Sequence, residues 1–370
     1  MAQRVSTFVE GFHEAAACAR MPYRALRPWR EGEATEPRIS ALGLGGSPFG
    51  DVYGEVPQES VDAVVECAIR GGVNVIDTAY WYGQGASESR LGKALQKIPR
   101  EAYYLHSKCG RYEKDVRKMF DFSAERTLRA VDEALRRLGV EYLDCMQIHD
   151  PEYAPSLDVI LEETLPALQK AKDAGKIRKI GITGYPLALH RELLKRSTVQ
   201  IDTCLFYCHY SLNDTSLFDD QELFTLLRDK DVGWLNASPI SMGLLSGGDP
   251  PKWHPASAEV KTACQTAAKI CREKSVSLPK LAIDFALRNT QVPCTLSGAA
   301  TKEIMQANLE TAYSAGKLSG VEQEVQTELR ERVFATLSQP SWEGVEVAQY
   351  HELLQRAKET GEAGATLSTN

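Results

Sequence analysis

Apolar and amphipathic segments alternate along the chain from about residue 39 onwards. Each unit has a short, mostly apolar run, a polar or glycine-containing turn, and a longer stretch with apolar residues every three or four positions. Short apolar runs between turn residues are typical of buried strands, and the longer spacing is typical of helices. The eight predicted strands are residues 39–46, 74–79, 103–110, 142–150, 177–185, 201–210, 231–238 and 292–299.

The helical pattern is clearest at residues 123–139, SAERTLRAVDEALRRLG. Its leucines and valine recur at spacings of three and four, Ser123 suits the N-cap, and Gly139 suits the position after the last turn. The same pattern occurs at 59–70, 87–97, 157–174, 187–196, 219–229, 257–288 and 301–313.

Strict alternation of strands and helices predicts parallel strands covered by helices. Eight units match a (β/α)8 TIM barrel, whose usual length is ~250 residues, and no Gly-x-Gly-x-x-Gly turn follows the first strand to suggest a Rossmann domain. We therefore predict an α/β protein with an N-terminal extension (1–20), a barrel (21–335) and a C-terminal tail (336–370).

Two further segments have a composition of their own. Residues 244–257, rich in glycine and proline, predict a long loop that is either a lid over a ligand or a plain surface loop. In the tail, residues 344–358 predict a helix and the residues after it predict disorder.

Composition excludes several classes of function. The 370 residues carry a net charge of −7, and no dense Lys/Arg run is present, which argues against a nucleic-acid partner. No segment reaches the 18 or so uninterrupted apolar residues of a membrane span or has a signal-peptide core. Nine cysteines without a C-x-x-C pair favour reduced thiols in the cytoplasm. The oligomeric state stays open.

The cysteines do not predict a metal site. Cys204 and Cys208 face one side of a predicted strand and His209 the other, so shared ligation is not expected. Cys109 is expected to be a small buried hydrophobe, with a reactive thiol as the alternative because Lys108 is adjacent.

Four polar residues fall at or after the ends of consecutive strands. Asp77 closes the second strand, Tyr82 follows it, Lys108 lies near the end of the third, and His149 ends the fourth. Taken singly, each has a simpler interpretation: the Asp can cap a helix, the Tyr ring can be packing, the Lys can be solvated, and the His can belong to the core. A barrel brings these ends to one mouth, with neighbouring strands ~4.8 Å apart, so we expect the four side chains to converge.

Their combined chemistry is proton transfer at an oxygen. A phenol has a pKa of about 10, and a neighbouring ammonium lowers it, which assigns Lys108 to tune Tyr82. Asp77 is expected to keep Lys108 charged and oriented, and His149 to position the substrate oxygen. Redox chemistry at such a site needs a hydride carrier, for which a nicotinamide is the simplest choice.

Several motifs resemble the aldo-keto reductase superfamily over about residues 21–315. They are D-T-A-x-x-Y-G at 77–83, S-K-C-G at 107–110, G-I-T-G at 181–184 and S-P-I-S-M-G-L-L at 238–245, together with the strand-end His149. More narrowly, K-C-G-R-Y (108–112), Y-C-H-Y-S-L-N-D (207–214) and W-H-P-A-S (253–257) resemble the L-galactose dehydrogenases and related aldose dehydrogenases. The resemblance implies the same catalytic tetrad.

The resemblance also implies a nicotinamide cofactor lying extended across the barrel mouth. Residues that match its binding positions are Gly46, Ser47, Asp77, Thr183, Gly184, Tyr207, Ser238, Pro239, Met242, Gly243, Leu244, Gly298, Ala299 and Asn308. Thr183 and Gly184 replace a Ser-Asn pair, and Ala237 replaces a stacking aromatic, so Tyr207 is expected to cover the nicotinamide.

The adenosine end predicts which cofactor is used. NADP-preferring relatives place a Lys and an Arg against the 2′-phosphate, where this chain has Gly298 and Ile304. NAD is therefore expected, and Lys302 nearby leaves NADP as the alternative.

The leading hypothesis is a cytosolic, NAD-dependent oxidation of an aldose such as L-galactose at C1 to the lactone, with Tyr82 as general base. Tyr53, Trp81 and Tyr112 are candidate walls for the sugar substrate, with plain packing as the alternative. A second hypothesis runs the site in reverse, as an NADPH-dependent aldehyde or carbonyl reductase. A third is a cofactor-sensing subunit bound to a partner protein, which the complete tetrad disfavours.

Overall fold

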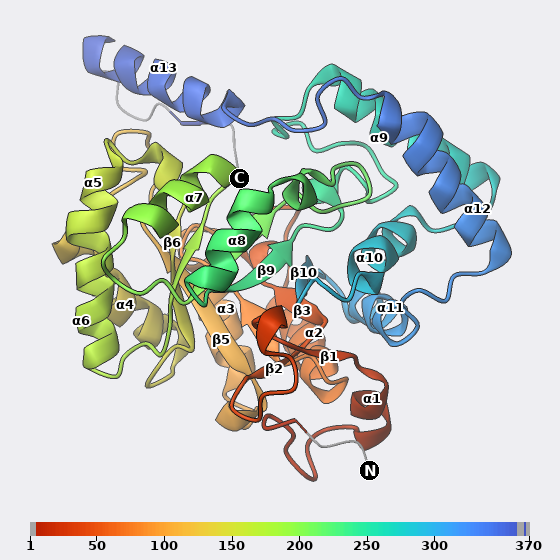
Figure 1. Cartoon of the computed structure of the whole chain (residues 1–370), viewed down its shortest axis with the longest axis horizontal. Coiled ribbons are helices and arrows are strands. Elements are labelled where there is room, and N and C mark those ends of the chain that lie inside the picture. Colours follow the sequence, from red (N-terminus) through yellow and green to blue (C-terminus); the bar gives the residue numbers. More distant parts are fainter. Residues whose placement is uncertain (1–4, 361–365, 368–370) are drawn as a thin grey trace.

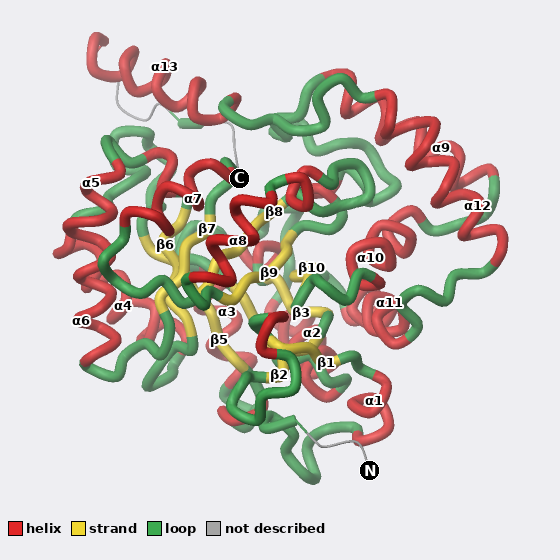
Figure 2. The backbone as a smooth tube through the Cα atoms, in the orientation of Figure 1, coloured by secondary structure: helices red, strands yellow, loops and turns green. Residues whose placement is uncertain are grey.

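The computed structural model describes residues 5–360, 366 and 367. Its centre is a closed barrel of eight parallel strands in the order β10-β3-β4-β5-β6-β7-β8-β9 (Figures 1 and 2). The strands are β3 (Leu42–Gly45), β4 (Val75–Asp77), β5 (Tyr104–Cys109), β6 (Cys145–His149), β7 (Ile180–Thr183), β8 (Thr203–Tyr207), β9 (Gly233–Ala237) and β10 (Thr295–Gly298). The predicted (β/α)8 barrel is confirmed, and every strand lies within its predicted range.

Helices surround the barrel (Figure 2). They are α2 (Gln58–Arg70), α3 (Ala86–Leu95), α4 (Ala124–Leu138), α5 (Leu157–Val159), α6 (Leu165–Asp173), α7 (Leu187–Arg196), α8 (Gln221–Asp229), α9 (Ala258–Glu273), α10 (Leu278–Arg288), α11 (Lys302–Tyr313) and α12 (Gly320–Glu328). As expected for α4, the Ser123 side chain accepts a hydrogen bond from the Arg126 N–H, and Gly139 ends the helix with φ of 68°.

The prediction of a single strand at 39–46 is wrong in one respect. The segment contains two strands, β2 (Arg38–Ser40) and β3, separated at Ala41. β2 pairs antiparallel with β1 (Tyr23–Ala25), and this hairpin lies outside the barrel sheet. The Ser40 hydroxyl donates to the Leu42 carbonyl at 2.7 Å, and this bond holds the turn between the two strands.

The prediction of one helix at 257–288 also needs correction, because α9 and α10 are separate. Ser275 adopts a left-handed backbone with φ of 54°, which stops α9. The Ser277 side chain then accepts from the Lys280 N–H and starts α10. Helix α12, which follows α11, was not among the predicted helices.

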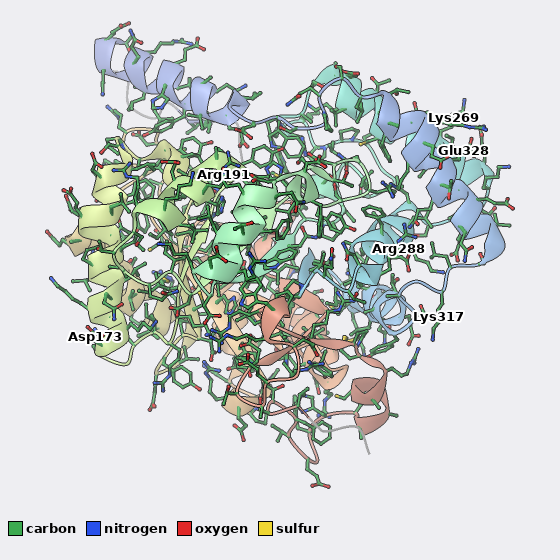
Figure 3. All side chains as sticks on the ribbon, viewed as in Figure 1. Asp173, Arg191, Lys269, Arg288, Lys317 and Glu328 are labelled. Carbon is green, nitrogen blue, oxygen red and sulfur yellow. The ribbon has the colours of Figure 1, made fainter. Side chains whose placement is uncertain are left out.

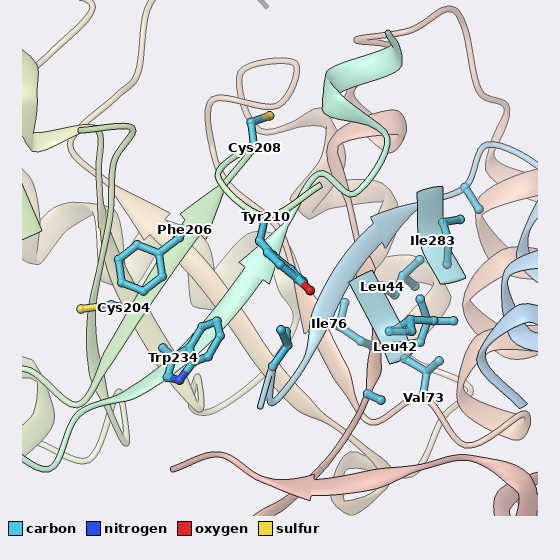
Figure 4. Packing of buried hydrophobic residues seen from close by; sticks show 14 of the residues in the cluster. Leu42, Leu44, Val73, Ile76, Cys204, Phe206, Cys208, Tyr210, Trp234 and Ile283 are labelled. Carbon is cyan, nitrogen blue, oxygen red and sulfur yellow. The ribbon is translucent and has the colours of Figure 1, made fainter. Parts of the chain in front are cut away.

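Alternating side chains of the strands form two buried layers. Leu42, Leu44 and Ile76 belong to the large cluster between the barrel and its helices (Figure 4). Leu205 and Leu235 belong to a second cluster, which also contains Leu26 and Ile39 from the β1–β2 segment. The β1–β2 segment therefore shares a second apolar cluster with side chains of the barrel strands. Charged side chains such as Asp173 and Lys317 extend into solvent (Figure 3).

The last helix of the described residues lies apart from the helices that surround the barrel. α13 (Val345–Thr360) confirms the helix predicted at 344–358, and Figure 1 shows the chain crossing from α12 to reach it. The predicted disorder falls partly on 361–365 and 368–370, which lie outside the described residues. Across the described part of the chain, no helix combines the length and the apolar character that crossing a membrane requires.

Candidate active site

A cavity of about 640 Å³ opens where the strands end. Its lining includes strand-end residues Gly45, Asp77, Lys108, His149, Thr183, Tyr207, Ala237 and Gly298. All four side chains of the expected tetrad line this cavity, as the parallel register of β4, β5 and β6 requires.

Lys108 lies at the centre of the tetrad. Its ammonium donates to the Asp77 carboxylate, to the Thr78 carbonyl at 2.8 Å and to the Tyr82 hydroxyl at 3.2 Å. The second oxygen of Asp77 accepts from the Gln147 amide at 2.7 Å. Because each donor and each carboxylate oxygen has a partner, this buried ion pair is held in one geometry.

The electrostatics of Tyr82 differ from the simple expectation. Burial raises the pKa of Tyr82 above 10, the Lys108 ammonium lowers it, and the Asp77 carboxylate raises it again. Lys108 lowers the pKa of Tyr82, as predicted, but the increase in pKa that burial causes is larger. Lys108 itself stays charged: burial lowers its pKa, yet Asp77 and Tyr82 together raise it to about 12.

Tyr82 is positioned by a tight contact between two loops. An added Cβ at Gly50 would lie 2.3 Å from the Tyr82 carbonyl carbon, so only glycine allows the loop after β3 to approach so closely. The Ser87 hydroxyl donates to the Gly46 carbonyl at 2.7 Å and lies 2.7 Å from the Thr78 hydroxyl, which ties the loop after β4 to the same place.

His149 is neutral in this setting. Burial lowers the pKa of His149 to about 4, although the neighbouring Asp150 opposes the shift. The Tyr82 and His149 rings meet edge to face, with centroids 6.0 Å apart. A neutral imidazole and a phenol can therefore both reach one substrate oxygen, the first orienting it and the second exchanging a proton with it.

An ion pair that the sequence reasoning missed lies beside His149. Arg111 donates to Asp150 at 2.8 Å, both side chains are buried, and both line the cavity. The Arg111 guanidinium also lies 4.1 Å from the Trp81 ring centroid. Arg111 stands inside the K-C-G-R-Y motif and Asp150 follows His149, so their positions at strand ends were the available signal.

The candidate substrate walls divide into two groups. Tyr53 and Trp81 line the cavity, and Tyr53 contacts Trp253 from the loop after β9 at a centroid distance of 5.9 Å. Tyr112 is not among the residues that line the cavity, which favours the packing alternative for this residue. Its hydroxyl accepts from the Gly110 N–H at 2.9 Å, and its ring packs under Arg126.

Most of the residues expected at a cofactor line the same cavity. They are Gly46, Ser47, Asp77, Thr183, Tyr207, Ser238, Pro239, Met242, Gly243, Gly298 and Ala299. Gly184, Leu244 and Asn308 do not line it: Gly184 faces the Glu152 carboxylate, Leu244 is fully buried, and Asn308 lies 3.5 Å from Ser297 behind β10. For these three residues, contact with a cofactor stays a prediction.

The shape of this region fits an extended phosphate-bearing cofactor. Ser238, Ser241 and Met242 adopt left-handed backbone conformations, which for non-glycine residues cluster at ligand sites. An added Cβ at Gly298 would lie 2.7 Å from the Pro48 ring, so glycine allows β10 and the loop after β3 to approach this closely. The 244–257 loop contributes Ser246, Asp249, Pro251 and Trp253 to the cavity, which favours the lid over the plain surface loop.

At the far end of the cavity, no Lys or Arg side chain is among the described lining residues. Beyond β10, the described lining residues are Gly298, Ala299, Ala300 and Ile304, and Ile304 is 45% exposed. Lys302 lines a different hollow, beside α1 (Ala15–Arg20) and α2.

The cysteines have no part in this geometry. Burial raises the pKa of Cys109 to about 12, and its thiol faces the Gln147 carbonyl, which favours the small buried hydrophobe. His209 bonds to the Tyr185 carbonyl and Ser216. Among the residues that the structure describes, no group of three His, Cys, Asp or Glu side chains gathers as a metal site would require.

Comparisons with known proteins agree with the fold. The chain is 41% identical over 308 residues to the L-galactose dehydrogenase of Arabidopsis thaliana, covering 82% of this chain and 93% of that protein. It is 29% identical over 321 residues to the D-arabinose 1-dehydrogenase of Saccharomyces cerevisiae, with the same two coverages of 82% and 93%.

A solved structure aligns over most of its length. The aldo-keto reductase AKR11C1 from Bacillus halodurans, in its holo form, matches with a TM-score of 0.62 and 26% identity, over 86% of this chain and 99% of that chain. The model of the Aldo/keto reductase family matches residues 41–322. The chain therefore belongs to the aldo/keto reductase family and is an NAD(P)-dependent oxidoreductase that acts on CH–OH groups.

Proposed function

We propose that this protein oxidises an aldose of the L-galactose type at C1 to the aldonolactone in the cytoplasm, with NAD as its cofactor. The observation that carries the proposal is the Asp77–Lys108–Tyr82 chain of hydrogen bonds beside a neutral His149 in one cavity. Support for the substrate class comes from the likeness to two sugar dehydrogenases.

The residues divide the reaction between them. Tyr82 takes the proton from the anomeric hydroxyl, and Lys108 stabilises the phenolate character that this step requires. His149 hydrogen-bonds to the same oxygen and holds it near Tyr82. When bound, the oxidised nicotinamide accepts the hydride from C1.

The preference for NAD follows from the far end of the cavity. Binding of a 2′-phosphate is normally supported by charge-assisted hydrogen bonds from Lys or Arg, each contributing about 1.5–3 kcal/mol. The described lining at that end offers glycine, alanine and isoleucine instead. NADP therefore lacks this source of affinity.

The test is a steady-state survey of aldoses with NAD and NADP, followed by absorbance of the reduced cofactor. We expect oxidation of L-galactose or a stereochemically related aldose with NAD. Tyr82→Phe should lower kcat/KM by at least about 10²-fold while the Kd for NADH stays within two-fold.

Tyr142→Phe is the matched control, because Tyr142 lies before β6, at the end of the strand away from His149, and should leave turnover unchanged. A wild-type enzyme that reduces aldehydes with NADPH and leaves sugars untouched would overturn the proposal. Full turnover in Tyr82→Phe would reject the mechanism.

A further inference from the structure

The C-terminal segment reaches the cavity from outside the part of the chain that the family model covers. That model ends at residue 322, and the segment from Trp342 to Thr360 follows α12 and its terminal turns. One residue of this segment, Glu346, lines the cavity that contains the tetrad. Glu346 is therefore an addition of this chain's own tail to the candidate active site.

Two aromatic contacts fix the segment on either side of Glu346. Trp342 stacks on Tyr185, with centroids 5.2 Å apart and planes 15° from parallel, and its backbone N–H donates to the Tyr185 hydroxyl at 3.2 Å. Tyr350 meets the Tyr153 ring edge to face at 5.3 Å. Because Tyr185 follows β7 and Tyr153 follows β6, these two contacts hold the segment over the ends of two neighbouring strands of the barrel.

Charged groups of the barrel surround the Glu346 carboxyl group. Burial raises the pKa of Glu346 to about 7, the Arg111 guanidinium opposes the shift, and the Asp150 carboxylate adds to it. Arg111 is already engaged with Asp150 at 2.8 Å. Within the described residues, the Glu346 carboxyl group has no hydrogen-bonded partner, so its oxygens are available as acceptors on the cavity side.

The position of Glu346 places it on the substrate side. Arg111 and Asp150 follow β5 and β6, next to His149, whereas the cofactor-like end lies beyond β10 at Gly298 and Ile304. A group that contacts Glu346 is therefore attached to the molecule whose reacting oxygen lies at Tyr82 and His149. An acceptor of this kind is satisfied by hydroxyl donors, and a sugar carries several.

We infer that Glu346 is a specificity-determining residue that binds hydroxyl groups of the aldose remote from C1. The inference rests on the proposed function, because it concerns the substrate of that same site. Glu346 accepts hydrogen bonds from these hydroxyls, and Arg111 on the facing wall limits how far the sugar extends. Substrates without additional hydroxyl groups gain nothing from this contact.

The test compares polyhydroxylated and simple substrates in Glu346→Gln and Glu346→Ala. For the best aldose, we expect KM to rise at least about five-fold while kcat stays within two-fold, since the contact is remote from the reacting carbon. Propanal has no hydroxyl groups for Glu346 to bind, so kcat/KM for its reduction with NADH should stay within two-fold of the wild-type value. The Kd for NADH should also be unchanged.

Glu352→Gln is the matched control, an exposed carboxylate on the same helix, and should leave every parameter unchanged. A wild-type enzyme that turns over no aldose overturns the proposed function and this inference together. If the wild type oxidises aldoses but both Glu346 variants keep its KM, only the inference is overturned. A variant that weakens aldose and propanal turnover equally also overturns it, because the role is then structural.

Discussion

At the residue scale, the site balances burial against charge. Tyr82 lies where desolvation disfavours a phenolate, and the Lys108 ammonium lies within hydrogen-bond distance of its hydroxyl. Lys108 keeps its charge there because Asp77 accepts from it, and Gln147 donates to the other oxygen of Asp77 and holds the carboxylate in place. Tyr82, the residue proposed to transfer the proton, is thus the last member of this buried chain of hydrogen bonds, and its pKa depends on the members behind it.

Removing the Lys108 ammonium should lower both the activity and the stability of the protein, for two different reasons. In Lys108→Met, Tyr82 loses the group that lowers its pKa, so we expect kcat/KM at pH 8 to fall about 10²- to 10³-fold. Asp77 is left as a buried charge without its cation, which typically costs about 3–5 kcal/mol of unfolding free energy. Urea denaturation and steady-state kinetics measure the two effects.

The double variant Asp77→Asn/Lys108→Met provides the control for the Lys108 prediction. It removes both charges, so stability should return toward that of the wild type while activity stays low. Restored turnover in the double variant, or unchanged turnover in Lys108→Met, would contradict the assigned role of the lysine.

The sequence predicted that Asp77, Tyr82, Lys108 and His149 meet in one cavity, but not all of their neighbours. Asp77, Lys108 and His149 sit at strand ends, where the barrel topology alone decides that they meet. Arg111 and Tyr112 are adjacent in the loop after β5, and the backbone turn after Gly110, whose φ is 107°, decides which of them faces the cavity. That choice is made by packing of the Tyr112 ring under Arg126, which no local pattern contains.

At the scale of elements, errors arose where one element ends and another begins without a glycine between them. The strand β2 and the strand β3 are separated by a single residue, Ala41, so the apolar pattern runs through both. Helix α9 stops at a left-handed Ser275 rather than at a glycine. Periodicity gave the type of each element, but their breaks depend on hydrogen bonds and backbone conformations that periodicity does not encode.

Close packing of two outer helices gives a test at this scale. An added Cβ at Gly92, on α3, would lie 2.3 Å from the Arg137 carbonyl oxygen of α4. Backbone cannot move away as a side chain can, so Gly92→Ala should lower the unfolding free energy by about 1–3 kcal/mol. The measurement is the urea midpoint at constant m-value.

Gly320 supplies the control for Gly92, because an added Cβ there meets nothing within 4 Å. Gly320→Ala should leave the midpoint unchanged or raise it slightly, by up to about 1 kcal/mol, as expected for alanine in a helix. Equal effects of the two substitutions would show that the α3–α4 contact is not as tight as described.

At the scale of the whole molecule, the active site exists only when distant parts of the chain have assembled. The tetrad requires three consecutive strands, whereas Trp253 comes from the loop after β9 and Glu346 from the tail. The tail returns to the mouth through Trp342 and Tyr350, which pack on residues about 150 to 200 positions earlier in the chain. Contacts at such sequence separation have no local signal, which is why Glu346 was not predicted.

Burial of histidines should make the whole fold sensitive to acid. Burial lowers the pKa of His149, His190 and His254 to about 4, whereas the unfolded chain titrates near 6.5. Between pH 6.5 and 4 the unfolded state binds more protons, so the unfolding free energy falls as the pH falls. Glu152 and Glu346 oppose this, because burial raises their pKa.

A single histidine can be isolated by difference. His190→Leu removes one histidine whose pKa is lowered by burial. The loss of unfolding free energy between pH 7 and pH 5 should therefore be smaller than in the wild type by roughly 2 kcal/mol, at about 1.4 kcal/mol per pH unit. Urea titrations of both proteins at the two pH values measure the difference. His351→Gln, at an exposed position on α13, should lose as much stability on acidification as the wild type does. A buried neutral imidazole takes up a proton when unfolding releases it into acidic water, and this uptake favours the unfolded state. If His190→Leu loses as much stability on acidification as the wild type, His190 is therefore not a source of the acid sensitivity.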